Sequence, residues 1–312
     1  MTSWRSVLRP NRFELWSLVA LALVTVLVAG GTAVRLLAFG IPAACFEPST
    51  PTAPACVAHE HLIGAYLETA AAWTLPSFAV IAILPVLAAL VLGVSLVGKE
   101  IDQRTTVFAW SLSPSRRRWL LLRLVPVGLA LMAFCFVAGG LGDVLEGLRQ
   151  PMIDPDRNFE GLGVRGVAIA GTGLLVFGIA LLSGALLGRL LPALLVSGAL
   201  VTGAYLGTSL LTDGLLLGES VIAESSAADG SRELETLVVT PEGEVINWDE
   251  AFARYGADVA QIGTEESRLR VVLRFVPGEI YPFAAARQAV LQGALGLVAI
   301  SLGFMVVERR RP

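Results

Sequence analysis

Charged residues are scarce in this sequence. Only 16% of its 312 residues are charged, whereas soluble domains carry about 25%. Lys99 is the single lysine, and the other cations are arginines that form short clusters beside apolar runs. No basic, aromatic-rich face of the kind that binds nucleic acid is present. The sequence therefore excludes an ordinary soluble domain and gives no support to a nucleic-acid partner.

Histidines are equally rare, and His59 and His61 lie in one short stretch with Cys56 and Glu60. A metal site is conceivable there, but alternate residues of a helix do not converge on one ion. Surface histidines are the expected alternative, so we predict no metal site. With both histidines in one loop, the chain lacks a nucleophile–histidine–acid set and we predict no enzymatic activity.

The chain also lacks a nucleotide site. Gly93 to Lys99 matches a phosphate loop as far as the lysine, but Glu100 stands where a Ser or Thr would hold Mg²⁺. The stretch also ends an apolar run instead of joining a strand to a helix. Ionisable residues in or beside the apolar runs lie near the ends of the runs, as Arg35, Glu68 and Arg165 do, which argues against a proton or ion relay.

Hydrophobic residues make up 55% of the chain and gather into long runs. A helix of about 20 such residues crosses the ~30 Å hydrocarbon core of a bilayer. We predict an all-α polytopic membrane protein with six transmembrane helices. The expected spans are 15–38, 73–98, 119–140, 163–187, 190–213 and 284–306.

The distribution of arginines predicts the orientation of these spans. The loop 99–118 is strongly basic, whereas the loop 41–72 contains no Lys or Arg. Short basic loops remain in the cytoplasm, so both termini are expected there, in a cell membrane. Residues 1–14 carry Trp4 and Phe13 among three arginines, which suggests an amphipathic interfacial helix, or alternatively a disordered tail with interfacial anchors.

Three cysteines have different expected roles. Cys45 and Cys56 lie in the loop predicted to face outward, where an oxidising compartment favours a disulfide over two free thiols. Cys135 falls within a predicted span, where ordinary packing is expected.

Two pairs of glycines recur at four-residue spacing, Gly184 with Gly188 and Gly203 with Gly207. Such pairs let membrane helices approach closely. We expect them to pack within the chain, in preference to forming a seam between subunits.

The segment 214–283 is long enough to fold, and its acids outnumber its arginines. Two β-like runs flank a turn at 241–243, and a short helix is expected from Asp249. Arg268–Val276 alternates cations with apolar residues, which suggests another strand or an interfacial element. We predict a small α+β extracytoplasmic cap between the fifth and sixth spans, with an irregular loop as the alternative.

The loop 99–118 resembles the connection between the second and third spans of ABC-2 type exporter permeases. The similarity rests on an acid, a Thr-containing turn, an apolar stretch, a Ser-Pro turn and arginines before an aromatic residue. The corresponding coupling-loop residues are Glu100, Asp102, Arg104, Thr105, Ser113, Pro114, Arg116 and Arg117. Arg104 departs from the family pattern, which commonly has Gly there.

Two further stretches resemble the same family. Gly184–Ala193 is similar to its turn between the fourth and fifth spans, and Tyr281-Pro282, Arg287 and Gln292 resemble the entry to its sixth span. The domain organisation implied is an interfacial segment 1–14, helices 1–5 over 15–213, a cap over 214–283, and helix 6 with a basic tail over 284–312.

The resemblance implies a mechanism and partners. Two six-span subunits, identical or related, pair with two cytoplasmic ATPase subunits that bind ATP and Mg²⁺, so this chain needs no cofactor of its own. The 99–118 loop docks on the ATPase, and Glu100 and Asp102 are placed to form polar contacts there. The cargo implied is hydrophobic or amphiphilic: a drug, antibiotic, peptide or lipid, as in multidrug or antibiotic efflux.

Two other functions remain open at this point. A non-transporting membrane sensor or anchor module would use the cap to bind a partner and would not need a moving loop. A membrane-embedded enzyme acting on lipids would need clustered acids, histidines or serines at one depth, which the sequence lacks.

Overall fold

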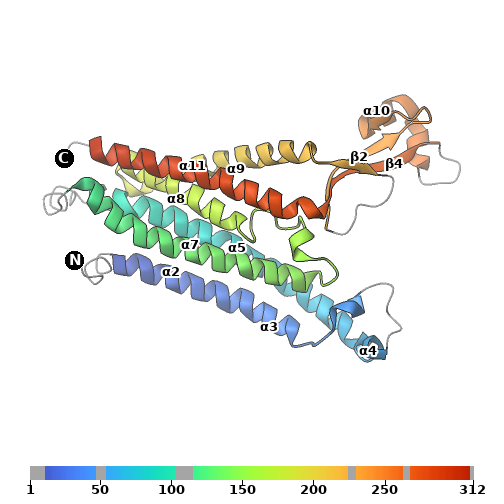
Figure 1. The fold of residues 1–312 in the computed structure, drawn as a ribbon, viewed down its shortest axis with the longest axis horizontal. Helices are drawn as coiled ribbons and strands as arrows, with labels where there is room; N and C mark the ends of the chain where they lie inside the picture. Colours follow the sequence, from blue (N-terminus) through green and yellow to red (C-terminus); the bar gives the residue numbers. More distant parts are fainter. Residues whose placement is uncertain (1–10, 47–53, 103–114, 224–229, 263–267, 310–312) are drawn as a thin grey trace. The chain divides into compact units, whose positions relative to one another are not determined.

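The computed structural model describes residues 11–46, 54–102, 115–223, 230–262 and 268–309. Within these residues, six helices are long and apolar enough to cross a membrane, which confirms the predicted number (Figure 1). The first, Arg12–Leu37, joins α2 (Arg12–Thr25), a π-helical turn and α3 (Gly31–Leu37). The others are α5 (Glu60–Asp102), α7 (Arg116–Arg149), α8 (Ala168–Leu187), α9 (Leu190–Leu217) and α11 (Tyr281–Arg309).

The chain divides into two compact units. The bundle unit comprises Met1–Met152, Gly161–Ser209 and Ala285–Pro312, and the cap unit comprises Ile153–Glu160 and Leu210–Ala284. The predicted cap, 214–283, corresponds to most of the second unit, but the contribution of Ile153–Glu160 was not expected. Of the predicted interfacial segment, residues 1–10 lie outside the described chain, and Arg12–Glu14 form the first turn of α2.

Two of the bundle helices are much longer than the predicted spans. Helix α5 has 43 residues and α7 has 34, where spans of 73–98 and 119–140 were expected. At ~1.5 Å per residue, α5 is ~65 Å long and extends well past a ~30 Å hydrocarbon core. Hydropathy marks only the part of a helix that lies in lipid, so it cannot locate the ends of such helices.

The fourth span begins later than predicted. Helix α8 starts at Ala168, not near residue 163, because the preceding residues form a turn. Gly161, Gly163 and Gly166 have φ values of 75°, 94° and 58° there, a backbone region that glycine adopts at little cost. Gly188, with φ of 62°, caps the C-terminal end of α8.

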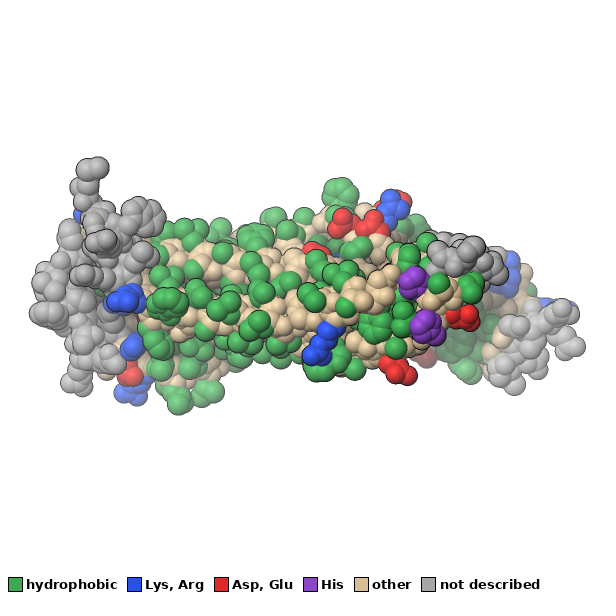
Figure 2. All heavy atoms as spheres, turned by 90° about the horizontal axis from the view of Figure 1, so that it is seen from below, with side chains coloured by type: hydrophobic (Ala, Val, Ile, Leu, Met, Phe, Trp, Pro, Cys, Tyr) green, Lys and Arg blue, Asp and Glu red, His purple; other side chains and the backbone are tan. Residues whose placement is uncertain are grey.

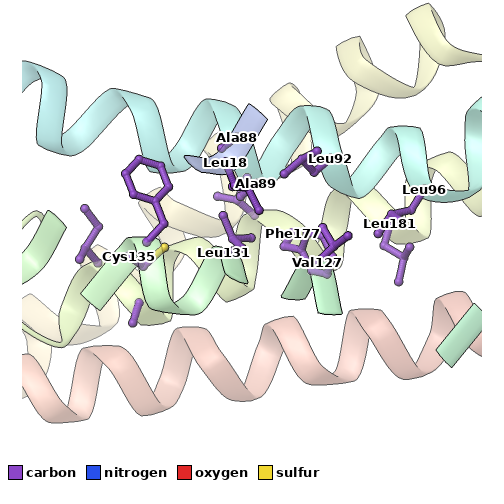
Figure 3. Packing of buried hydrophobic residues seen from close by; sticks show 14 of the residues in the cluster. Leu18, Ala88, Ala89, Leu92, Leu96, Val127, Leu131, Cys135, Phe177 and Leu181 are labelled. Carbon is purple, nitrogen blue, oxygen red and sulfur yellow. The ribbon is translucent and has the colours of Figure 1, made fainter. Parts of the chain in front are cut away.

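Helix α8 is the centre of the bundle. In the most apolar stretch of α8, 78% of the residues are buried, against 11% in α9. Small side chains and glycines on α8 allow this enclosure, because they let neighbouring backbones approach. Figure 3 shows side chains from α2, α5, α7 and α8 that meet in the core. Those labelled are Leu18, Ala88, Ala89, Leu92, Leu96, Val127, Leu131, Cys135, Phe177 and Leu181.

The cap unit contains an antiparallel four-stranded sheet with strand order β1-β4-β2-β3. The strands are β1 (Val221–Ala223), β2 (Arg232–Val239), β3 (Val245–Asn247) and β4 (Arg270–Val276). Helix α10 (Trp248–Tyr255) begins directly after β3, where the Asn247 side chain accepts a hydrogen bond from the amide of Glu250 at 2.8 Å.

The observed β2–β3 hairpin, α10 and β4 confirm the elements predicted for this segment. Val238, Ile246, Ala251, Val259 and Leu269 form the apolar core beneath α10. Strand β1 was not predicted: like β3 it has only three residues, too few to show a period of two, and it lacks the adjoining turn at 241–243 that identified β3.

Candidate functional site

The predicted coupling segment lies where α5 ends and α7 begins. Asp102 is the last residue of α5 and Arg116 the first of α7. Figure 1 shows that α2 begins and α11 ends at this same end of the bundle. Lys99 and Asp102 are exposed, and Glu100 belongs to the last turn of α5. The predicted coupling residues Arg104, Thr105, Ser113 and Pro114 lie outside the described residues.

The first turn of α7 is rich in positive charge. Ser115 caps the helix, because its hydroxyl accepts a hydrogen bond from the amide of Arg118 at 3.1 Å. Arg116, Arg117 and Arg118 occupy the turn, and it contains no acid. The N-terminus of a helix already carries a partial positive charge. Three arginines there oppose the helix dipole, so helix stability does not explain them.

The start of α7 is bonded to two other helix ends. The Nη1 of Arg116 donates a hydrogen bond to the backbone carbonyl of Glu308 at 3.2 Å, which satisfies a carbonyl in the last turn of α11. The Nδ2 of Asn11 donates to the carbonyl of Leu122 at 3.2 Å, which connects the start of α2 to the second turn of α7. A displacement of the first turns of α7 would therefore strain its hydrogen bonds to both α2 and α11.

A surface groove of about 380 Å³ lies beside this turn, between α7 and α11. Arg117 and Leu121 line it from α7, and Phe304 and Glu308 line it from α11. Figure 2 shows Lys and Arg side chains at this end of the bundle, next to a long and largely hydrophobic surface. The basic residues are therefore gathered at one end of the bundle, and the hydrophobic surface beyond them is suited to contact with lipid.

An ion pair of a buried arginine, which sequence reasoning missed, holds the connection between α7 and α8. Arg165 was expected near the outer end of a span, and its side chain is fully buried, whereas the side chain of its partner Asp143 is 37% exposed. Its Nη1 lies 3.1 Å from Oδ1 of Asp143, on α7. A Cβ at Gly142 would lie 2.9 Å from the Cβ of Arg165. The glycine-rich sequence around Arg165 was the available signal of such close packing.

The cysteines of the connection between α3 and α5 are joined in the structure. Cys45 and Cys56 form a disulfide with their Cα atoms 5.2 Å apart. Phe39 and Phe46 pack against the ring of Tyr66 beside it, with ring centroids 5.7 and 5.0 Å away. Cys135 is a free, buried cysteine in the bundle core.

The nucleotide-like stretch has a packing role. Gly93 to Glu100 lies within α5, and a Cβ at Gly93 would lie 2.6 Å from the Cβ of Ala180. The glycine thus permits contact between α5 and α8, and the stretch has no strand–loop–helix geometry. Among the described residues, no group of three or more His, Cys, Asp or Glu side chains is placed to hold a metal ion.

The two glycine pairs have different environments. A Cβ at Gly184 would lie 2.8 Å from the carbonyl oxygen of Val94 on α5, so packing within the chain is confirmed there. At Gly203 and Gly207 on α9, an added Cβ would have nothing within 4 Å. The prediction of intrachain packing is therefore wrong for the second pair, because α9 turns these glycines away from its neighbours.

Comparisons with known proteins agree with this architecture. A family model described as ABC-2 membrane transporter related matches residues 15–212, which is more than half of the chain. No curated protein and no solved structure matches it. The matched region covers nearly all of the first five spans and the sequence between α5 and α7. With its six membrane-spanning helices, the chain belongs to the ABC-2 membrane transporter related family and is a multi-pass membrane protein of the transporter permease type.

Proposed function

We propose that this chain is the membrane subunit of an ATP-driven exporter and that a separate cytoplasmic ABC ATPase binds the end of the bundle formed by α5 and α7. The observation that carries the proposal is the arginine-rich first turn of α7. Its charge opposes the helix dipole, and an acidic surface on a partner would compensate it. Arg116 is bonded to the end of α11, and Asn11, at the start of α2, is bonded to α7. A partner bound to the first turn of α7 would therefore act on three helices.

The charge distribution supports a cytoplasmic location for this end. Arg12 and Arg309, at the two ends of the described chain, flank helices that begin or end beside Arg116. Membrane proteins retain arginine-rich ends in the cytoplasm. Both termini are therefore cytoplasmic in this proposal, and the membrane is the cell membrane.

A second permease subunit, identical or related, completes the proposed transporter. Helix α9 is the least buried span, and Gly203 and Gly207 leave its outward face open to a close neighbour. The cargo is a hydrophobic or amphiphilic compound, such as a drug, antibiotic, peptide or lipid, because the spans offer mainly apolar surface.

The test is ATP hydrolysis by the complex of this chain with a cytoplasmic ABC ATPase that co-purifies with it. Arg117→Ala and Glu100→Ala are expected to weaken the association by about tenfold or more, since each removes a charge at a polar interface. The control is Arg268→Ala, an exposed arginine of the cap unit, which should leave association and turnover unchanged. Equal turnover in all variants would remove the arginine-rich end from the coupling role.

The same purification decides between transport and the alternatives. A sensor or anchor module would co-purify with a partner but would show no nucleotide-dependent transport of cargo. A lipid-modifying enzyme would act on lipid with no ATPase present. Either result would refute the exporter proposal.

A further inference from the structure

A half-open cavity of about 280 Å³ lies in the bundle unit, between α5, α8 and α9. Ala82 and Val86 line it from α5, Thr172 lines it from α8, and Thr202 and Tyr205 line it from α9. The volume is close to the lower end of the ~300–1,000 Å³ typical of ligand pockets. It suits a small compound or one end of a larger one.

None of the described residues that line this cavity is charged. Most of them are aliphatic, and only two threonines and one tyrosine contribute polar side chains. An ionised group placed against this wall would lose part of its hydration without gaining a counter-charge, which is unfavourable. The chemistry of the wall therefore selects an uncharged ligand with a mainly apolar body.

A hydrogen-bond network holds the polar side of the cavity in place. The Thr172 hydroxyl donates to Oε1 of Gln292 on α11 at 2.8 Å, and Nε2 of Gln292 donates to Oγ1 of Thr208 on α9 at 3.2 Å. The Thr208 hydroxyl in turn donates to the backbone carbonyl of Tyr205 at 3.0 Å. These bonds join α8, α9 and α11 beside the cavity. They hold the segment of α9 that carries Tyr205 in place.

The phenol of Tyr205 lies at the cavity but does not take part in this hydrogen-bond network. Within the part of the chain that the structure describes, its hydroxyl makes no hydrogen bond to another residue. A Cβ at Gly163, which has φ of 94°, would lie 3.3 Å from this hydroxyl. The turn before α8 therefore approaches Tyr205 closely only because residue 163 is glycine. A half-buried phenol in an apolar wall favours a ligand that offers a hydrogen-bond partner.

We infer that this cavity binds an uncharged amphiphile, with its apolar body against Ala82 and Val86 and a hydroxyl or carbonyl group hydrogen-bonded to Tyr205. The identification of this ligand as cargo rests on the exporter function proposed above. Binding itself requires only the cavity of a single subunit.

The test uses photolabelling of the full-length protein in nanodiscs. The probe is a fatty alcohol that carries a diazirine in its chain, with the matching fatty acid and a phosphatidylcholine bearing the same diazirine chain for comparison. Peptide mass spectrometry should place the alcohol label in the 82–86 and 201–206 segments. The ionised acid should label them about tenfold less, because the cavity offers no counter-charge.

Matched substitutions separate this cavity from the general lipid surface. Ala82→Phe fills it and should reduce labelling about tenfold. The control is Ala133→Phe, which fills a groove of about 290 Å³ between α2 and α7 whose lining carries no hydroxyl, and which should leave cavity labelling unchanged. Should Ala82→Phe fail to fold, Tyr205→Phe preserves the shape and should weaken alcohol labelling about three- to tenfold through the lost hydrogen bond.

Each outcome is decisive. Equal labelling by the alcohol and the acid, or labelling insensitive to both cavity substitutions, would overturn the inference. Equal labelling by the phosphatidylcholine would show that a bilayer lipid tail fills the space and would overturn it too. In a second arm with the ATPase bound, the alcohol should stimulate ATP hydrolysis in the Ala133→Phe protein but not in Ala82→Phe. Cavity labelling without stimulation would support the site and refute its role in export.

Discussion

Replacing Gly184 by alanine is expected to destabilise the bundle, whereas the same replacement at Gly207 is not. A Cβ at Gly184 would lie 2.8 Å from the carbonyl oxygen of Val94 and 3.2 Å from its Cα. Both are backbone atoms of α5, so no side-chain rotation relieves the contact. To reach ordinary van der Waals distance, α5 and α8 must separate by more than half an ångström.

The size of the effect follows from two opposing terms. Overpacking of a close contact costs about 1–3 kcal/mol. Exchange of glycine for alanine in a helix contributes about 1 kcal/mol in the favourable direction, and this contribution is common to Gly184→Ala and Gly207→Ala. The difference between the two variants therefore isolates the contact, and Gly184→Ala should be less stable than Gly207→Ala by about 1–3 kcal/mol.

The assay is reversible unfolding by sodium dodecyl sulfate in mixed micelles, followed by tryptophan fluorescence. Light scattering should accompany it, because Gly207 lies on the open face of α9 and its replacement can alter subunit association without altering the fold. Equal midpoints for the two variants would refute the argument that α5 and α8 meet at Gly184.

Three further predictions address the ion pair, the disulfide and the cap. Asp143→Asn removes the negative charge that faces the buried Arg165. It should lower the unfolding free energy by about 1–3 kcal/mol, less than for a fully buried pair, because the Asp143 side chain is 37% exposed. An additional Arg165→Met substitution should recover part of this loss, and additivity in the double-mutant cycle would contradict a direct pair. Loss of the disulfide in Cys45→Ser should cost about 2–4 kcal/mol in thermal unfolding, and unfolding of this variant should not respond to reductant; a wild-type protein equally indifferent to reductant would show that Cys56 is not bonded. Glu242 accepts hydrogen bonds from its own backbone amide and from Thr240, and these bonds hold the pKa of its carboxyl below that of an ordinary glutamate. The stabilising contribution of Glu242 is therefore present above the pKa of the unfolded state. It is lost as the pH falls through the lower pKa of the folded state. Carbon-13 carboxyl NMR should show a titration midpoint below those of ordinary glutamates, and an ordinary midpoint would refute these bonds.

Much of the architecture could be predicted from local sequence. Six apolar runs give six spans, and the period-two pattern and turn residues around 241–243 give the β2–β3 hairpin, because both signals depend on residues close in the chain. The ends of α5 and α7 could not be predicted, since their helices continue beyond the lipid where hydropathy falls.

Features that depend on distant neighbours were less accessible. Gly184 and Gly207 have the same four-residue spacing to a second glycine, yet only Gly184 meets another backbone. Arg165, in the turn before α8, is paired with Asp143, twenty-two positions earlier on α7. The cavity beside Tyr205 likewise requires three helices and a glycine turn to be in place, so no single stretch of sequence encodes it. Half of the predicted coupling residues, Arg104, Thr105, Ser113 and Pro114, fall outside the described residues, and the contacts of the coupling segment with an ATPase stay a prediction.

The enclosure of α8 has a consequence for biogenesis. Helices of a polytopic protein enter the bilayer in order and associate afterwards, so α8 must be surrounded by lipid before α9 and α11 are synthesised. Its mean hydropathy of 2.1 favours insertion into lipid, whereas its glycines allow the later close packing against other helices. A substitution that makes α8 more polar is therefore expected to impair its insertion into the bilayer, even where the finished protein has room for it.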